Sequence, residues 1–285
     1  MSENKDHGDI YILARDHDGS TRLTAQHFLM TTRIGGLLMP QLEPTAQKPG
    51  VKIADIATGN GIWGAYAAVA YPEAQVIGLD ISDQQFPPAW TWPKNLSLDI
   101  CNILRPLPQK LVGYFDIVNV RLLAPGLSGR KDFMTAIERF SDLLKPGGYL
   151  QWRDIHFPAW QTLDESLVID DKRFSRFAQL LDEVLEGGIS NRMFELGDLV
   201  TENPTFTEVS THEPPILPWL LEYETSGAVK TFSEMLATAR MTLARSERRK
   251  LALADEAQRQ MDEYLRRQGL MVLKTKVITA KKAGV

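Results

Sequence analysis

The sequence predicts an α/β protein built on a mostly parallel β-sheet with helices on both faces. Short apolar segments typical of strands alternate with segments typical of helices between residues 51 and 152. A glycine-rich turn follows the first of these strands directly and opens a helix. Because parallel strands need a crossover connection, this alternation favours parallel crossover units within a single sheet.

The elements of this unit follow one another in a regular order. The helix after the first strand carries Trp63 and Tyr66 and stops before Pro72, which cannot continue it. A second helix is expected over 131–144 and is followed by the turn 145–148. Five short apolar runs are the expected strands: 51–56, 75–80, 95–100, 114–120 and 149–152.

Further elements are expected on both sides of this unit. A polar tail, 1–9, precedes a helix over 20–38 that Pro40 closes. After the fifth strand, helical stretches are expected at 170–186, 195–201 and 220–267, and two more strands at 207–211 and 274–282. We therefore expect one enlarged domain with three parts: 1–45 with a lid helix, 50–155 as the cofactor-binding core, and 156–285 with the rest of the sheet and helical lid insertions.

Composition excludes several classes of protein. The chain has 285 residues and a net charge of −4, which argues against binding nucleic acid by general electrostatics. A single cysteine, Cys101, excludes a disulfide framework. No apolar run approaches the roughly 20 residues needed to span a bilayer. We expect a cytoplasmic protein with a small-molecule partner, no nucleic acid and no membrane, and the sequence leaves a homodimer open.

The glycine-rich turn is the strongest local signal for a ligand site. Gly59 and Gly61 follow the first strand, so the backbone can turn tightly and a ligand can approach it closely. The N–H groups at the start of the next helix favour an anionic ligand group. Asp80 ends the second strand about 20 residues beyond the glycines, the offset at which a carboxylate meets ribose hydroxyls.

Two further acids discriminate between nucleotide cofactors. Asp55 ends the first strand beneath the glycine turn, where its charge would repel a pyrophosphate but would suit an ammonium group. S-adenosylmethionine carries such a group on its amino-acid part. Asp99 ends the third strand, where we expect it to accept a hydrogen bond from the adenine amino group, with Ile100 against the ring.

These residues carry a family resemblance. Residues 54–63 resemble the first motif of class I S-adenosylmethionine-dependent methyltransferases, and more closely a group found in fungal secondary-metabolite gene clusters. That group shows an ATGxGIW turn, an acid-Ile-Ser segment running into QFPP, Arg-Leu-Leu after the fourth strand and LLKPGGYLQW at the fifth. Here these lie at 57–63, 80–82 with 85–88, 121–123 and 143–152. The segment from Arg22 to Phe28 also resembles the group, and the resemblance covers about residues 11–155.

The resemblance implies a Rossmann-like seven-stranded sheet, mostly parallel, with an antiparallel last strand. It implies a cofactor site in which Asp55 lies near the ammonium, with Gly59 and Gly61 beneath the methionine part. Ala57 takes the place of the first glycine that class I enzymes more usually have. Asp80 would hold the ribose with Ile81 beside the adenine, and Asn119 would lie near the sulfonium. Where the group often has two acids after Trp152, this chain has Arg153 before Asp154.

Candidate catalytic residues follow from the expected site segments. Methyl transfer needs in-line alignment and a deprotonated acceptor, so a base is required where the acceptor is protonated. His156 and His27 are the candidate bases. Candidate substrate contacts are Arg121, Trp152 and Tyr11. The five histidines show no metal-ligand spacing, so no metal is expected.

The sequence thus predicts a methyltransferase acting on oxygen or nitrogen of a small organic secondary metabolite, with sulfur the less favoured acceptor. S-adenosylmethionine is the expected cofactor and S-adenosylhomocysteine the product. Two alternatives stay open. One is a pericyclase or cyclase that keeps the cofactor without methyl transfer, and the other is a regulator that binds the cofactor without catalysis.

Overall fold

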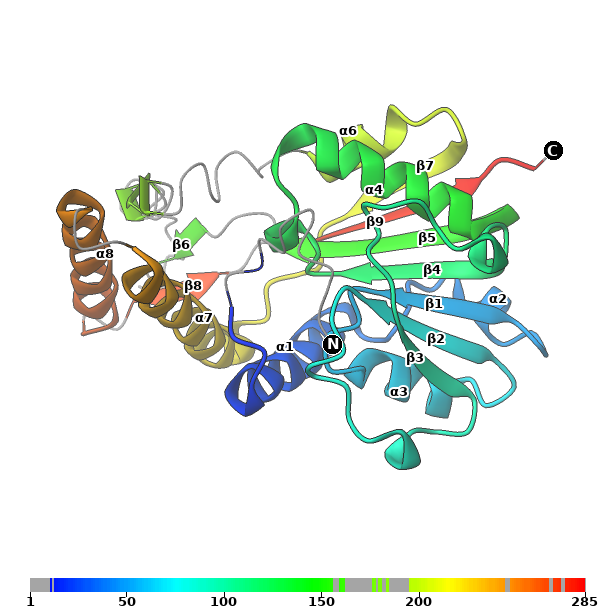
Figure 1. Ribbon diagram of the computed structural model, residues 1–285, viewed down its shortest axis with the longest axis horizontal. Helices are drawn as coiled ribbons and strands as arrows, with labels where there is room; N and C mark the ends of the chain where they lie inside the picture. Colours follow the sequence, from blue (N-terminus) through cyan, green and yellow to red (C-terminus); the bar gives the residue numbers. More distant parts are fainter. Residues whose placement is uncertain are drawn as a thin grey trace.

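Seven strands form one central sheet in the order β3-β2-β1-β4-β5-β9-β7 (Figure 1). The computed structural model describes residues 11, 13–155, 159–161, 176–177, 179–180, 183–184, 195–243, 247–266, 269–272 and 275–284. The strands of the sheet have the following bounds: β1 Lys52–Ile56, β2 Gln75–Asp80, β3 Leu96–Ile100, β4 Phe115–Arg121, β5 Leu144–Ile155, β7 Phe206–His212 and β9 Thr275–Lys282.

Strand direction confirms the predicted sheet. β3, β2, β1, β4 and β5 pair in parallel, whereas β9 is antiparallel to both of its neighbours, β5 and β7. The last strand is therefore the one that runs against the others, as expected for the Rossmann-like sheet. A separate antiparallel pair, β6 (Ala159–Gln161) with β8 (Leu270–Val272), was not expected from the sequence.

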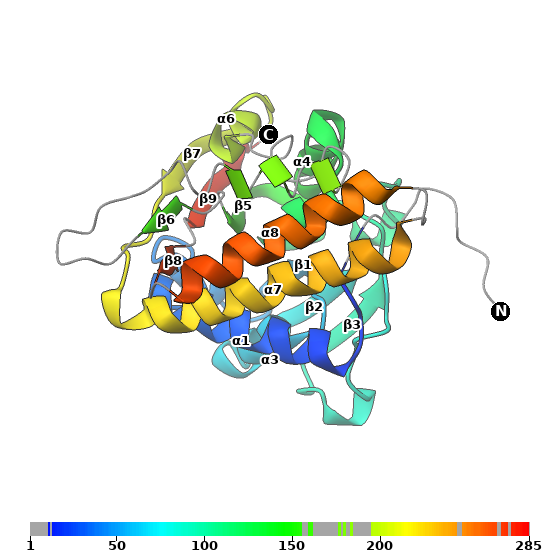
Figure 2. The same cartoon turned by 90° about the vertical axis from the view of Figure 1, so that its left-hand side faces the viewer.

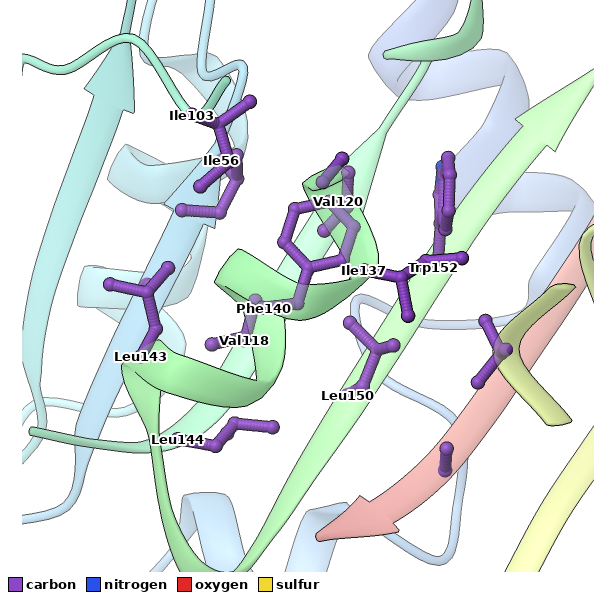
Figure 3. Packing of buried hydrophobic residues seen from close by; sticks show 14 of the residues in the cluster. Ile56, Ile103, Val118, Val120, Ile137, Phe140, Leu143, Leu144, Leu150 and Trp152 are labelled. Atoms are coloured by element: carbon purple, nitrogen blue, oxygen red, sulfur yellow. The ribbon is translucent and has the colours of Figure 1, made fainter. Parts of the chain in front are cut away.

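One face of the sheet is covered by α4 (Gly129–Leu143) and α6 (Leu196–Thr201). The buried side chains of this face are apolar, and Figure 3 shows Ile137 and Phe140 of α4 above Val118 and Leu150 of the strands. Trp152 lies in the same cluster. This face is a continuous hydrophobic core.

The other face is covered by α3 (Ile62–Ala70), α2 (Glu43–Ala46) and the chain that follows α1 (His17–Ile34). The carboxylate of Asp16 accepts a hydrogen bond from the Gly19 N–H, which starts α1 earlier than expected. Gly35, with φ 82°, ends the helix in a left-handed cap.

The expected long helical stretch near the C-terminus is a pair of helices, α7 (Leu221–Thr242) and α8 (Arg248–Arg266). Figure 2 shows α8, α7 and α1 lying side by side. Four short 3₁₀ helices complete the described elements: Ala89–Thr91, Gln109–Leu111, Ala124–Gly126 and Pro218–Leu220. Within the described ranges, no helix is both long and apolar enough to cross a membrane.

Candidate functional site

A cavity of about 560 Å³ opens at the carboxyl ends of the parallel strands. Its wall comes from the turn after β1, the start of the segment after β2, and the loops after β3 and β4. α1 and α7 close it from the side opposite the sheet. Ligands bind at this edge in open α/β sheets, because the connections there diverge to opposite faces. The cavity also falls in the size range of small-molecule sites, about 300–1,000 Å³.

The turn after β1 lies on the cavity wall and has a backbone conformation that favours glycine. Ala57, Gly59 and Gly61 all have positive φ, at 55°, 59° and 74°. A Cβ added to Gly61 would stand 2.9 Å from Cδ1 of Leu98. Such a conformation costs a residue that carries a Cβ about 1–2 kcal/mol, so Ala57 stores strain at the cavity wall.

Asp80 ties the end of β2 to this turn. Its Oδ2 accepts a hydrogen bond from the Gly59 N–H at 2.8 Å, and its Oδ1 accepts one from the Ser82 N–H at 3.2 Å. Burial raises the pKa of Asp80, and the two N–H donors oppose that effect. Asp80 and its neighbour Ile81 both line the cavity, where the sequence predicted them.

Asp55 and Asn119 lie beneath the turn rather than on the cavity wall, and their expected places near an ammonium and a sulfonium stay predictions. Asp55 accepts hydrogen bonds from Thr58 Oγ1 at 2.6 Å and from Asn119 Nδ2 at 2.9 Å. Asn119 Oδ1 accepts from Gln151 Nε2 at 3.0 Å. All three strand residues are buried on the α3 face, and burial raises the pKa of Asp55. Asp55, with Asn119 and Gln151 next to it, supports the turn through Thr58. Neither Asp55 nor Asn119 lines the cavity.

Asp99 and Ile100 also differ from expectation. The Asp99 side chain is 59% exposed and lies 3.6 Å from Lys110, and Ile100 is 56% exposed. Both belong to an edge strand and neither lines the cavity, which is lined by the next residues, Cys101, Asn102 and Ile103.

The strand register explains this shift. Asp80 pairs with Ile100, so the residues after Ile100 lie level with those after Asp80, at the same edge of the sheet. The position directly after the strand therefore predicted the residues that line the cavity on the expected adenine side better than Asp99, the acid within the strand, did. Sequence reasoning missed Asn102 for this reason.

His27 lies on the wall that α1 contributes. It is 1% exposed, packs against the ring of Tyr66, and holds its Nδ1 3.3 Å from Nη1 of Arg121. Burial first, and then the charges of Arg121 and Arg153, lower the pKa of His27 to about 3. A guanidinium only donates, so Nδ1 accepts and the ring proton lies on Nε2. His27 is therefore neutral and presents an N–H, which suits a hydrogen-bond donor better than the expected base.

Arg121, the last residue of β4, lines the cavity as expected and pairs in register with Arg153 of β5. Burial lowers the pKa of Arg121, and the nearby Asp55 opposes this. Burial and the charge of Arg121 lower the pKa of Arg153 to about 9. The carboxylate of Asp154, also at the end of β5, is engaged by the backbone, because its Oδ2 accepts from the Ala124 N–H at 2.9 Å.

Trp152 does not line the cavity, contrary to expectation. It is fully buried against Phe133 and Phe140 of α4 (Figure 3), and its Nε1 donates to Asp154 Oδ2 at 3.1 Å. Side chains alternate along a strand, so Trp152 faces α4 while Gln151 and Arg153 face the other side. Asp154, which was not a predicted site residue, lines the cavity, and burial raises its pKa to about 6.

The remaining predicted residues divide into two groups. Tyr11 lines the cavity, and its hydroxyl accepts a hydrogen bond from Nη2 of Arg22 at 3.2 Å. His156 lies outside the described residues. Among the residues that are described, no cluster of three His, Cys, Asp or Glu side chains could hold a metal ion.

Comparisons with known proteins agree with this geometry. The chain is 37% identical to methyltransferase grgD of a Penicillium species over 56% of its own length and 57% of that protein. It is 30% identical to N-methyltransferase verN of Clonostachys rogersoniana over 50% and 48%. The chain thus spans about half the length of the curated relatives it matches. No family model matches it.

Solved structures show the same fold. A Haemonchus contortus phosphoethanolamine N-methyltransferase 2, in complex with S-adenosylhomocysteine, superposes with a TM-score of 0.53 at 16% identity. The superposition covers 99% of this chain and 61% of that one. The chain therefore has the Rossmann-like fold of S-adenosylmethionine-dependent methyltransferases, and its resemblance to the fungal secondary-metabolite group is confirmed.

Proposed function

We propose that this protein is an S-adenosylmethionine-dependent methyltransferase that acts on oxygen or nitrogen of a small organic acceptor. One observation carries the proposal: Gly59, in the positive-φ turn after β1, donates a hydrogen bond to Asp80, and both residues line the cavity. The relatives' names support it, because they are methyltransferases and include an N-methyltransferase.

The residues present fit the cofactor in charge and shape. Ala57, Thr58 and Gly59 of the turn line the cavity, where they would lie beside the methionine part. Asp80 keeps lone pairs for ribose hydroxyls after binding two backbone N–H groups. Ile81, with Asn102 and Ile103 from the loop after β3, forms the wall on the adenine side. When bound, the cofactor would supply a methyl group activated on a sulfonium.

The chain itself contributes position and exclusion of water. α1 lies over the turn, because Asn60 Nδ2 donates to Ser20 O at 3.0 Å and to Thr24 Oγ1 at 2.9 Å. Buried ion pairs join α1 to α7, Arg22 with Glu234 at 2.9 Å and Arg33 with Glu224 at 3.2 Å. Helices held rigidly over the cavity in this way align two reactants, which can lower the activation barrier of the reaction by several kcal/mol. The lid role of α1 and α7 is part of the proposal.

Calorimetry with S-adenosylhomocysteine tests the proposed cofactor. Asp80→Ala should weaken binding by about 1–3 kcal/mol, roughly 5- to 150-fold, through lost charge-assisted hydrogen bonds. Asp83→Ala, which removes an exposed acid three residues away, is the matched control and should bind like wild type. If NAD binds and S-adenosylhomocysteine does not, the proposal fails.

Turnover separates methyl transfer from the two alternative functions. Incubation of the protein with S-adenosylmethionine and a panel of phenols, carboxylic acids and amines should form S-adenosylhomocysteine with at least one acceptor. Cofactor binding without S-adenosylhomocysteine formation from the whole panel would favour a cyclase or a regulator instead.

A further inference from the structure

We infer that the cavity holds a subsite for a carboxylate of the acceptor, formed by Arg121, positioned by Nδ1 of His27 and supported by Arg153. The inference rests on the proposed function and adds a substrate class to it: an acidic small molecule. The three side chains come from the ends of β4 and β5 and from α1, and meet beside the glycine turn.

These side chains offer donors that the described part of the chain does not use. Within it, His27 Nε2, Arg121 Nε, and Arg153 Nε and Nη1 are buried without a hydrogen-bond partner. Within the described residues, Arg153 Nη2 donates a long hydrogen bond to the Leu37 carbonyl at 3.5 Å. Buried polar groups are rarely left unpaired, because each costs about 1–3 kcal/mol. Arg121 lines the cavity whereas Arg153 does not, so the guanidinium of Arg121 is the group that a ligand able to accept hydrogen bonds can reach.

Charge points in the same direction. The other two buried arginines near the cavity have carboxylate partners, Arg22 with Glu234 and Arg33 with Glu224. The acids closest to Arg121 and Arg153 are already engaged: Asp55 with Thr58 and Asn119, and Asp154 with backbone N–H groups. A pair of adjacent buried guanidinium groups is costly without a counter-charge, and an incoming carboxylate would supply one.

The geometry of the donors suits a carboxylate. Arginine presents a planar fork that can bind two oxygens at once. His27 is neutral and its Nδ1 accepts from Arg121, so it orients the guanidinium without adding a third charge. Arg153 does not line the cavity, and we assign it the supporting role of raising the positive potential at Arg121.

The rest of the cavity suits the body of such a molecule. Apolar side chains from α1 and α7 line it, among them Met30, Ala228, Phe232 and Met235. A mainly apolar wall with a few convergent polar groups is the usual form of a small-molecule site. We therefore expect an apolar or aromatic acid.

A carboxylate could also come from the cofactor, because Arg121 lies close to the turn. Val120 pairs with Ile56, so Arg121 is level with Ala57. The experiment must separate the two sources. Benzoate serves as the acceptor probe and benzamide as its uncharged counterpart. 5′-Methylthioadenosine serves as a cofactor probe that lacks the amino-acid part.

Titration calorimetry is carried out on the protein saturated with S-adenosylhomocysteine. Benzoate should bind and benzamide should bind at least about tenfold more weakly, since a charge-assisted hydrogen bond is lost. Arg121→Gln should weaken benzoate binding at least tenfold, and His27→Phe, which keeps the ring packing, should weaken it severalfold. Arg130→Gln, on the exposed face of α4, is the matched control and should bind benzoate like wild type.

Three outcomes would overturn the inference. Benzoate fails to bind, or binds no better than benzamide, in the wild-type protein, a comparison that needs no variant to fold. Alternatively, Arg121→Gln weakens S-adenosylhomocysteine but not 5′-methylthioadenosine, which would assign the subsite to the cofactor's carboxylate. Failure of wild type to bind S-adenosylhomocysteine at all would instead reject the proposed function. Arg121→Lys, which keeps the charge, should retain part of the benzoate binding.

Discussion

The two faces of the sheet are built from alternate residues of the same strands, yet they differ in chemistry. Towards α4, the buried side chains are apolar, with Trp152 between Phe133 and Phe140. Towards α3 and α1, the carboxyl ends of the strands bury a polar row, Asp55, Asn119, Gln151 and Arg153, beside the partly buried Arg121. The first face supplies stability, and the second accepts costly polar burial where the cavity opens.

We expect the largest effect of a substitution on stability at Trp152, on the α4 face of the sheet. Trp152→Ala should lower the free energy of unfolding by about 3–5 kcal/mol, because it empties the centre of the α4 face. Urea unfolding measures this. Trp90→Ala is the matched control, since Trp90 is 86% exposed and should change stability by only about 0.5 kcal/mol or less. A Trp152→Ala protein that is as stable as wild type but impaired in turnover would instead indicate that Trp152 contacts the substrate.

The two faces should also respond oppositely to pH. Asp154 has a folded pKa of about 6 against an ordinary 3.8, so the folded state keeps a proton that the unfolded chain loses. Its contribution to stability is present below pH 4 and is lost as pH rises through about 6. His27 has a folded pKa of about 3 against 6.5, so its contribution is present above pH 6.5 and is lost as pH falls towards 3.

Removing each group should therefore change the pH dependence in opposite directions. Between pH 4 and 6, Asp154→Asn should remove a fall in stability with rising pH, on the order of 1–3 kcal/mol. His27→Phe should remove a rise over the same window. Thermal unfolding of both variants across this range measures the slopes. Equal slopes in wild type and both variants would show that neither group has a shifted pKa.

A smaller effect, on stability and on ligand binding, should distinguish the glycines of the turn after β1 from glycines of other loops. Gly61→Ala should cost about 1–2 kcal/mol of stability through the positive φ, and should also weaken S-adenosylhomocysteine binding. Gly113→Ala matches it in backbone strain, with φ 61° and open space around it. It should cost similar stability and leave binding unchanged. If both variants bind alike, the turn does not contact the cofactor.

The elements of the fold could be predicted from the sequence because period and turn chemistry are local properties. The alternation of strands and helices located all seven strands of the sheet, and the motifs pointed to Gly59, Gly61 and Asp80. The boundaries shifted where a cap decided them, as at Asp16 and Gly35. The division of 220–267 into α7 and α8 depends on packing against α1 that no local signal encodes.

The orientation of site residues was harder to predict, because it depends on which face of the sheet each residue occupies. Trp152 and Arg153 are adjacent in sequence but bury on opposite sides. Asp99 ends a strand as expected, yet an edge strand leaves it in solvent. The protonation of His27 depends first on its burial and then on the charge of Arg121, which is 94 residues away in sequence. Such pairings are products of the tertiary structure.

Hydrogen exchange with and without S-adenosylhomocysteine tests most directly the claim that the cofactor binds on the glycine-turn side of the sheet. Binding should slow exchange of the amides in 57–62, 80–82 and 101–104, with added protection of α1, and should leave α4 unchanged. Protection of α4 with no change at 57–62, in a protein shown by calorimetry to bind the ligand, would contradict the account.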